Sequence, residues 1–546
     1  MKTYDYIVIG GGTAGCIVAA RLAEDPDVRV LLLEAGPSDR HWTIRIPGAM
    51  GHNYEGGPFN WAFHTVPQKE LNGRSIFQPR GRVLGGSSSI NGMVFLRGHA
   101  LDYERWAREG AEGWAYADVL PYFRRSERVA GAPSVYRGDK GPIVVRRGIV
   151  SNPINIAFLE AGQEAGYPLT EDPNGYQQEG FGPWDISVDG GVRANTPHAY
   201  LRGTGPNPRI RIETRALATR ILFDRKRAIG VEYLAAGART TVFASREVVL
   251  AGGAFHSPQL LMLSGVGPAD HLRGHGIDVV ADLPGVGGNL QDHMQLRIQY
   301  ASKVPCSLNP HARGVRKALA GVQWLLTHGG PASTNHLDVG AFLRGRAGVA
   351  HPDMQIHFRP LLFDGWKPSA EHGYNFGIGT LRAASRGTVR LRNADPRTAP
   401  LIDPNYFGTD EDVADMRNYF KLTMELAAQR AFDPFRGREV TPGAALRTDS
   451  EIDAYLRAHA DAGHHPAGTC RMGGSDAVLM PDLAVRGVDG LRVVDASAFP
   501  NVPSANPYAA VVMLAERASD IIRGRGLLPR LTAPFHVADR HATAQR

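Results

Sequence analysis

The sequence predicts an α/β protein in which a Rossmann-like domain is assembled from discontinuous segments, beside an α+β domain with an antiparallel sheet. The chain opens with a strand, a glycine-rich turn and a helix, the order found in Rossmann-like units. A further strand and helix are expected around residues 247–263. Alternating strands at about 354–358 and 374–381 predict the second, antiparallel sheet.

The first unit contains the elements of a dinucleotide fingerprint in their usual order. A strand is expected over residues 6–9, a helix over 14–23 and a second strand over 28–33, which ends at Glu34. The turn after the first strand has the spacing G-x-G-x-x-G, formed by Gly10, Gly12 and Gly15. This context predicts a dinucleotide-binding βαβ unit and leaves NAD and FAD both open.

Each residue of this fingerprint has a physical reason. Gly10 permits a tight turn, Gly12 lets the backbone approach a pyrophosphate, and Gly15 lets helix and strand pack closely. The helix N-terminus offers free N–H groups to phosphates. Glu34 is expected to accept hydrogen bonds from a ribose, which argues against the 2′-phosphate of NADP.

Composition excludes several classes of protein. The net charge of +7 over 546 residues is a weak field, and the densest basic cluster, residues 225–227, is expected to be a hairpin turn, so no nucleic-acid binding is predicted. Three cysteines provide neither a disulfide framework nor a CxxC metal pair. We expect no signal peptide, no transmembrane segment and a cytoplasmic location. Glycine makes up 64 of the 546 residues, a larger share than the usual ~7%. This excess indicates many sites where backbone segments approach each other closely.

Two later segments resemble the signatures of one family. Residues 81–91 read GRVLGGSSSIN, and residues 253–267 read GAFHSPQLLMLSGVG, with Ser257-Pro258 expected to start a helix. The chain is similar to glucose-methanol-choline (GMC) oxidoreductases over about residues 4–525. Within that family it resembles choline dehydrogenase-like members and aryl-alcohol or hydroxymethylfurfural oxidase-like members.

The resemblance implies FAD as the cofactor. It implies that the glycine turn holds the diphosphate, that the 82–91 loop runs beside the flavin, and that Ala218 contacts the adenine. Some members attach FAD through a histidine where this chain has Ile90, so the resemblance implies non-covalent FAD. The implied cofactor-binding residues are Gly10, Gly12, Thr13, Ala14, Gly15, Glu34, Ala35, Arg82, Leu84, Gly85, Gly86, Ser87, Asn91, Gly92, Met93, Val94, Ala218, Ala251, Asp495, Ala496 and Pro507.

The resemblance also implies two catalytic residues, His465 and Asn506. His465 precedes Pro466 in the segment HHPAGTCRMG, and a histidine suits proton transfer near neutral pH. Asn506 precedes a helix expected over 508–522, so the pattern also predicts that it caps this helix. His464 either shapes access to the flavin or adds a second titrating group. No metal site is predicted.

The activity implied is oxidation of a primary alcohol to an aldehyde by hydride transfer to flavin N5, with oxygen as the expected acceptor. Two alternatives stay open: a quinone-linked dehydrogenase, and a flavin-bearing lyase or photoenzyme of the same family. The sequence does not indicate an oligomeric state. An aromatic set is a candidate lining for the substrate pocket: Trp324, Phe342, Phe358, Phe363 and Trp366.

The predicted domain organisation is discontinuous. Residues 1–155, 200–300 and 476–525 are assigned to the FAD-binding domain, and residues 156–199 and 301–475 to the substrate-binding domain. Residues 528–546 lose periodicity and are expected to form a loose C-terminal tail.

Overall fold

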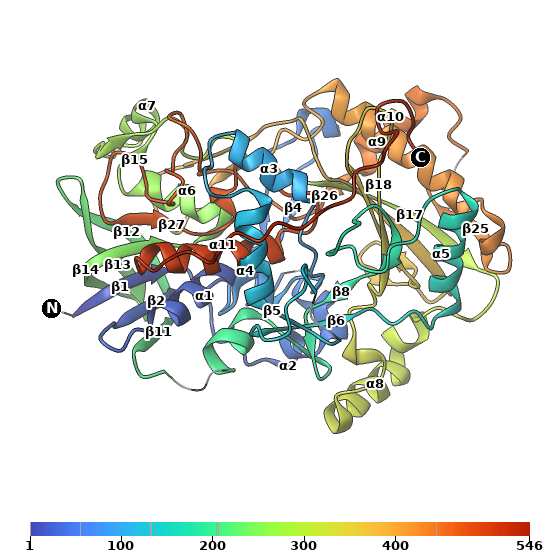
Figure 1. The fold of residues 1–546 in the computed structure, drawn as a ribbon, viewed down its shortest axis with the longest axis horizontal. Coiled ribbons are helices and arrows are strands. Elements are labelled where there is room, and N and C mark those ends of the chain that lie inside the picture. Colours follow the sequence, from blue (N-terminus) through green and yellow to red (C-terminus); the bar gives the residue numbers. More distant parts are fainter. Residues whose placement is uncertain (1, 55, 132–133, 204, 206, 444) are drawn as a thin grey trace.

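The computed structural model describes residues 2–54, 56–131, 134–203, 205, 207–443 and 445–546. Two seven-stranded sheets stand at opposite ends of an elongated molecule (Figure 1). This arrangement leaves a space between the two sheets in which segments from the whole length of the chain meet.

The first sheet is formed by β1 Thr3–Ile9, β2 Val30–Glu34, β11 Ile210–Thr214, β12 Ala216–Asp224, β13 Arg227–Ala235, β14 Ala238–Leu250 and β27 Leu491–Val493. Its order is β11–β2–β1–β14–β13–β12, with β27 paired to β14. The strands from β11 through β14 and on to β27 run parallel, whereas β12, β13 and β14 pair antiparallel. Strands from three distant parts of the sequence confirm the predicted Rossmann-like domain of discontinuous segments.

Two helices complete the core of this domain. α1 (Thr13–Leu22) and α11 (Tyr508–Ile522) contact each other, and Figure 1 shows them side by side along the first sheet. Nearly every residue of α11 is buried, because the helix is apolar around most of its circumference. The predicted helix over 508–522 agrees with α11, and the predicted helix over 14–23 agrees with α1 to within one residue at each end.

The helix after β14 differs from the prediction. α6 (Gly253–Leu263) begins four residues before Ser257, so Pro258 lies inside the helix and not at its start. A proline has no N–H for the carbonyl four residues earlier, here that of Ala254. The Thr469 hydroxyl donates to that carbonyl at 2.7 Å and replaces the missing bond. The expected start was wrong because this compensation comes from a distant segment.

The second sheet is antiparallel throughout, in the order β25–β17–β22–β19–β18–β7, with β26 paired to β17. Its strands are β7 Gly180–Pro183, β17 Met294–Ser302, β18 Val339–Leu343, β19 Met354–Arg359, β22 Gly373–Thr380, β25 Arg436–Thr441 and β26 Asp461–Ala462. β17 begins inside the segment 200–300 that was assigned to the first domain. α5 (Pro153–Glu164) and α9 (Asp410–Ala427) contact this sheet and share its apolar core.

The remaining longer helices are α3 Ala100–Arg108, α4 Tyr116–Ser126, α8 Gly314–Thr327 and α10 Asp449–His459. Within the described residues, no helix combines the length and apolarity needed to cross a bilayer.

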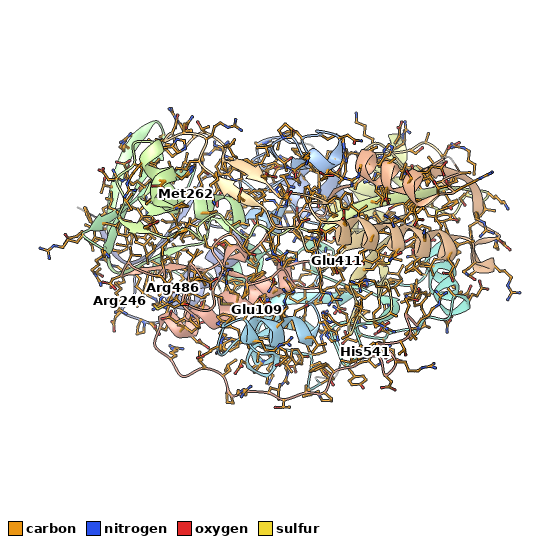
Figure 2. All side chains as sticks on the ribbon, turned by 90° about the horizontal axis from the view of Figure 1, so that it is seen from above. Glu109, Arg246, Met262, Glu411, Arg486 and His541 are labelled. Carbon is orange, nitrogen blue, oxygen red and sulfur yellow. The ribbon has the colours of Figure 1, made fainter. Side chains whose placement is uncertain are left out.

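Residues 528–546 contain neither helix nor strand. They are nevertheless held along the molecule: the Leu531 N–H donates to Ala117, and the Gly348 N–H donates to the carbonyl of His541 at 2.7 Å. Figure 2 shows His541 in the same half of the molecule as Glu411 of α9 and far from Arg246. This segment therefore extends from the first domain to the second.

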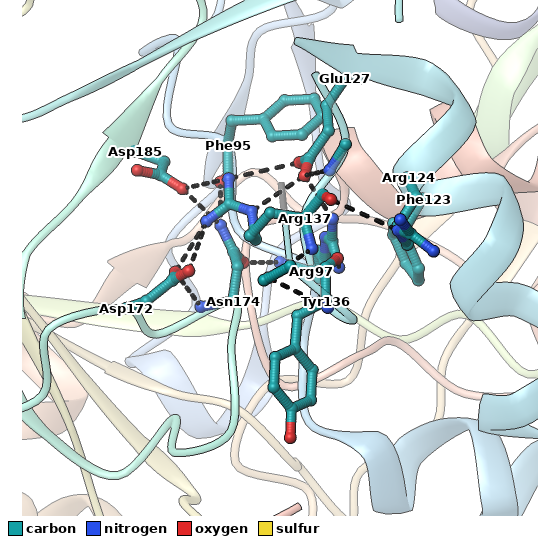
Figure 3. A network of polar contacts seen from close by, with 12 residues as sticks. Phe95, Arg97, Phe123, Arg124, Glu127, Tyr136, Arg137, Asp172, Asn174 and Asp185 are labelled. Atoms are coloured by element: carbon teal, nitrogen blue, oxygen red, sulfur yellow. Dashed lines mark hydrogen bonds and ion pairs between the residues drawn. The ribbon is translucent and has the colours of Figure 1, made fainter. Parts of the chain in front are cut away.

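A buried ionic network joins the region around α4 to the approach to the second sheet (Figure 3). The Glu127 Oε1 atom forms ion pairs with the Arg97 Nη2 atom at 2.6 Å and with the Arg137 Nε atom at 2.9 Å. The Arg137 guanidinium also contacts Asp172 and Asp185, each at 2.7 Å. Arg137 thus contacts three carboxylates on separate segments, and burial makes this arrangement sensitive to the loss of any member.

Candidate active site

A cavity lies between the two sheets. On one side it is lined by the carboxyl ends of three parallel strands, at Ile9, Leu33 and Leu250. On the other side it is lined by residues of β17, β19 and β22 in the antiparallel sheet. Crevices at the carboxyl ends of parallel strands are where open α/β sheets bind ligands.

Backbone segments meet closely at the first-sheet end of the cavity. A Cβ on Gly10, whose φ is +97°, would lie 2.5 Å from the Ala251 carbonyl oxygen. A Cβ on Gly15 would lie 1.9 Å from the Gly10 oxygen, and one on Gly86 would lie 2.7 Å from the Cα of Gly12. Only glycine permits this packing, which leaves an open backbone cradle between the β1–α1 turn and the loop of residues 82–91, called the serine loop.

Glu34 supplies a carboxyl group to the same end of the cavity. It ends β2, and its Oε1 accepts a hydrogen bond from the Gly36 N–H at 2.7 Å. Burial raises the pKa of Glu34 to about 7, against the backbone hydrogen bonds that lower it. A buried carboxyl group with acceptor capacity fits a ligand that brings hydroxyl donors, as a ribose does. The glycine cradle and Glu34 together fit the adenosine diphosphate half of FAD.

Most residues implied for the cofactor do line the cavity: Gly10, Gly12, Thr13, Ala14, Glu34, Ala35, Gly86, Ser87, Asn91, Gly92, Met93, Val94, Ala218, Ala251, Asp495, Ala496 and Pro507. Four others shape it from behind its wall: Gly15, Arg82, Leu84 and Gly85. The Leu84 side chain is part of the core, and the Arg82 guanidinium stacks over Trp61 at 4.9 Å. The Gly85 N–H donates to the Gly11 carbonyl and so holds the loop against the β1–α1 turn.

His465 and Asn506 meet in the cavity although they are distant in sequence. The Asn506 Nδ2 atom lies 3.1 Å from the His465 Nε2 atom and 3.3 Å from the His357 Nε2 atom. Gln355 donates to the Asn506 Oδ1 atom at 3.1 Å. The predicted capping role of Asn506 is wrong, because Pro507 holds the cap position of α11 without a side-chain hydrogen bond. Its amide instead contacts three side chains, those of His465, His357 and Gln355.

His465 is fixed from its other side as well. Its backbone N–H donates to Asp292 Oδ1 at 2.6 Å, and its Nδ1 atom lies 2.9 Å from the Nδ1 atom of His293. Asp292 is held in turn by the Tyr406 hydroxyl, which donates to Oδ2 at 2.5 Å. The imidazole therefore has defined partners at both ring nitrogens.

The surroundings keep His465 neutral. Burial holds the pKa of His465 well below 6.5, and the neighbouring His293 and His357 lower it further. The amide of Asn506 donates to Nε2, so in the neutral ring the proton sits on Nδ1 and is donated to His293. The Nε2 lone pair then faces the cavity side of the ring, which is the arrangement a general base requires.

Further cavity residues were missed by the sequence reasoning. His357 and Arg359 of β19 and Arg297 of β17 line the cavity, and Gln355, two residues before His357, contacts Asn506 from outside the lining. In the sheet register, Arg297 and His357 both pair with Gly377 of β22. The polar alternation of residues 355, 357 and 359 was a readable signal, since the intervening residues are all apolar.

The pocket aromatics divide into two groups. Phe363 and Trp366 line the cavity as predicted. The prediction is wrong for the other three, which are buried in apolar clusters elsewhere: Trp324, Phe342 and Phe358. Periodicity alone does not separate a core aromatic from a pocket aromatic.

His464 lies beside the pocket aromatics. Its ring lies 5.8 Å from that of Tyr54 and 6.4 Å from that of Trp366, and burial lowers its pKa to about 3. A neutral ring packed in this way shapes the cavity wall. Among the described residues, no group of three His, Cys, Asp or Glu side chains is placed to hold a metal ion.

Comparison with known proteins identifies the family. Models of the GMC oxidoreductase family match residues 4–295 and 383–515. The chain is 49% identical to mitochondrial choline dehydrogenase of Mus musculus, over 98% of this chain and 91% of the mouse protein. It is 45% identical to oxygen-dependent choline dehydrogenase of Brucella ovis, over 96% of each chain. The structure of pyridoxine 4-oxidase from Mesorbium loti superposes with a TM-score of 0.87 at 29% identity, over 96% of this chain and all of that one.

These matches span both sheets and every segment that lines the cavity. The chain therefore belongs to the GMC oxidoreductases and is an FAD-dependent alcohol oxidoreductase.

Proposed function

We propose that this enzyme oxidises a primary alcohol to an aldehyde, with dioxygen as the electron acceptor. The observation that carries the proposal is the 3.1 Å contact between Asn506 Nδ2 and His465 Nε2, inside the cavity that also holds the glycine cradle. An amide donor and a neutral imidazole acceptor side by side are the two groups that a bound hydroxyl needs.

In the proposed reaction, the substrate hydroxyl inserts between these two groups. His465 accepts the hydroxyl proton at Nε2, and Asn506 donates a hydrogen bond from Nδ2 to the oxygen as negative charge develops there. His293 accepts from His465 Nδ1 and stabilises the imidazolium that forms. Asp292 holds the His465 backbone, which keeps the ring in place during proton transfer.

When bound, FAD would supply a two-electron acceptor for the hydride of the carbinol carbon. The residues proposed to hold it are the Gly10–Gly12 turn, Glu34 and the serine loop. We propose that binding is non-covalent, because Ile90, which lines the cavity at the place implied for attachment, has an unreactive side chain.

The choice of oxygen is supported by the relatives. The Brucella ovis protein is named as oxygen-dependent, and the Mesorbium loti protein is named as an oxidase. With oxygen as acceptor the reaction balances as R–CH₂OH + O₂ → R–CHO + H₂O₂. In the quinone-linked alternative, the same two electrons and two protons pass to a quinone.

Anaerobic flavin reduction separates these possibilities. The purified holoenzyme is mixed with a panel of primary alcohols without oxygen, the flavin absorbance is followed, and oxygen is then admitted while peroxide is assayed. Bleaching followed by rapid, stoichiometric peroxide release is the expected result. Bleaching with slow reoxidation by oxygen and fast reoxidation by a quinone would favour the dehydrogenase. No bleaching by any alcohol would contradict the proposal.

A further inference from the structure

The end of the cavity beside His465, Asn506 and the antiparallel sheet is called the substrate end. It carries positive charge without matching carboxylates. Arg80, Arg297 and Arg359 line the cavity, whereas its described carboxylate residues are Glu34 and Asp495. Glu34 lies at the glycine cradle. Asp495 accepts hydrogen bonds from the Gly253 and Ser497 N–H groups and from the Ser257 hydroxyl. Like Glu34, it therefore lies at the end of the cavity lined by the first sheet.

The three arginines differ in how many hydrogen-bond acceptors the protein offers to their guanidinium groups. Arg80 donates to the His464 carbonyl at 2.6 Å and also to Pro79. Arg297 has one carbonyl acceptor, Gly365 at 2.8 Å. Arg359 makes no hydrogen bond or ion pair with any described residue, and its Nε atom is buried without a partner.

Arg297 and Arg359 are partly buried, and withdrawing a cation from water without a carboxylate partner is costly. Burial lowers the pKa of Arg297 to about 10, and it lowers the pKa of Arg359 as well. The charge of Arg359 lowers the pKa of Arg297 further. The charge of Asp461 acts on the pKa of Arg297 in the opposite sense and raises it, but burial outweighs this effect. A ligand with negative charge would relieve this cost.

Sheet register places this charge beside the proposed base. β19 carries His357, which contacts Asn506, and Arg359 two residues further along the same face. Two residues of a strand span about 7 Å. In the sheet register, Gly377 of β22 stands between Arg297 of β17 and His357 of β19. An anionic group on Arg359 would thus lie a few carbon atoms from a hydroxyl held by His465 and Asn506.

The rings beside Arg297 complete the subsite. The Arg297 guanidinium carbon lies 4.8 Å from the centre of the Phe363 ring and 5.2 Å from that of Trp366. Stacking of this kind fixes the plane of a guanidinium and leaves its edge free for bidentate contact with a carboxylate or phosphate.

We propose that Arg297 and Arg359 bind an anionic group of the substrate, so that the alcohol oxidised by this enzyme is a short hydroxy acid or hydroxyalkyl phosphate and not a quaternary ammonium alcohol. This inference rests on the proposed alcohol oxidation. By this inference the substrate of this chain differs from choline, after which the relatives are named. The cationic group of choline would lie against two arginines in this cavity. The oxidation itself is unchanged: the carbinol carbon loses a hydride and the hydroxyl its proton, and dioxygen becomes H₂O₂.

The first test needs no variant. The holoenzyme is assayed with 4-hydroxybutyrate, 3-hydroxypropyl phosphate, the neutral 1,4-butanediol and the cation choline, and kcat/KM is compared. At least one anionic alcohol is expected to exceed both the diol and choline by about tenfold to a hundredfold, the value of one or two hydrogen bonds to a charged group. The two anionic arms distinguish a carboxylate from a phosphate. A kcat/KM for choline equal to or higher than that for both anionic alcohols would overturn the inference. It would leave the proposed alcohol oxidation intact.

The second test assigns the preference to the arginines. R359M and R297M are each expected to reduce the ratio of kcat/KM for the anionic alcohol over the diol by about tenfold or more, and R359K is expected to restore part of it. R211M, on the outer strand β11, is the matched control and should leave the ratio unchanged. A ratio that is unaltered in both cavity variants would overturn the assignment.

Binding separates this inference from the proposed function. Butyrate, which has no hydroxyl, should bind the wild-type holoenzyme in calorimetry and bind more weakly to R359M. If no alcohol reduces the flavin, the proposed oxidation fails, yet this binding result still tests the anion subsite. No butyrate or phosphate binding by the wild type would overturn the subsite.

Discussion

The Nδ1 atoms of His293 and His465 lie 2.9 Å apart, so one imidazole must donate a proton to the other. Asn506 donates to His465 Nε2, which leaves Nδ1 of His465 as the donor and His293 as the acceptor. His293 thereby selects the tautomer in which His465 Nε2 is free to take a proton. We regard His293 as a positioning residue that acts through His465.

Replacing His293 tests this role. H293F removes the acceptor, and the rate of anaerobic flavin reduction by alcohol is expected to fall on the order of ten- to a hundredfold, less than the ~10²–10⁴-fold that a general base contributes, because the base itself stays. H293N keeps an acceptor atom near the position of Nδ1 and should recover part of the rate. Equal rates for wild type and H293F, with FAD bound in both, would show that His293 does not orient the base.

The lowered pKa of His465 predicts the pH dependence of the reaction. A base is active while it is unprotonated, and burial with three neighbouring histidines holds the pKa of His465 well below 6.5. The acid limb of kcat/KM for a neutral alcohol should therefore lie below pH 6.5, since a neutral substrate does not titrate. A limb at or above pH 6.5 would mean that the imidazole is not desolvated as the structure indicates.

The Arg137 network predicts a large loss of stability from a change far from the active site. R137M removes the one cation that contacts Glu127, Asp172 and Asp185 together, and breaking a buried ion pair typically costs about 3–5 kcal/mol. The melting temperature of the holoenzyme should fall clearly. R211M removes the exposed pair with Glu213, worth about 0–1 kcal/mol, and should melt close to the wild type. Similar melting temperatures for the two variants would argue against a structural role for the network.

Buried histidines predict a loss of stability in acid, and His99 offers a clean test. Burial lowers the pKa of His99 to about 4, whereas an unfolded histidine titrates near ~6.5. The contribution of His99 to the free energy of unfolding is therefore fully present above pH ~6.5. It decreases as the pH falls toward 4, because the unfolded chain binds the proton at a higher pH than the folded chain does. His99 also caps α3 by accepting from the Leu101 N–H.

In H99N the asparagine can accept the same capping bond but does not titrate. The fall in melting temperature between pH 7 and pH 4 should be smaller than in the wild type. An unchanged slope would show that His99 does not contribute to acid sensitivity.

Local patterns predicted the parts of the fold and site that depend on neighbouring residues. The turn containing Gly10 and Gly15 could be read from spacing, because each glycine answers a steric demand of one strand–turn–helix unit. His465 was found from a short motif. α11 was found from its apolar composition and the Asn-Pro pair before it.

The rest depends on contacts between distant segments. Asn506 turns from its expected cap toward His465 because the second sheet supplies Gln355 and His357 as partners. Arg297 and Arg359 become neighbours only through the register of β17, β22 and β19. No spacing within one segment encodes that register, so the approach of Arg297 to Arg359 could not be predicted from the sequence.

The most direct test of the central claim is anaerobic flavin reduction in H465A. We expect the variant to bind FAD with a wild-type absorbance spectrum and to be reduced by alcohol more slowly by about 10²–10⁴-fold, the range for loss of a general base. Reduction of the H465A flavin at a near-normal rate by the same alcohol would contradict the assignment of His465 as the base.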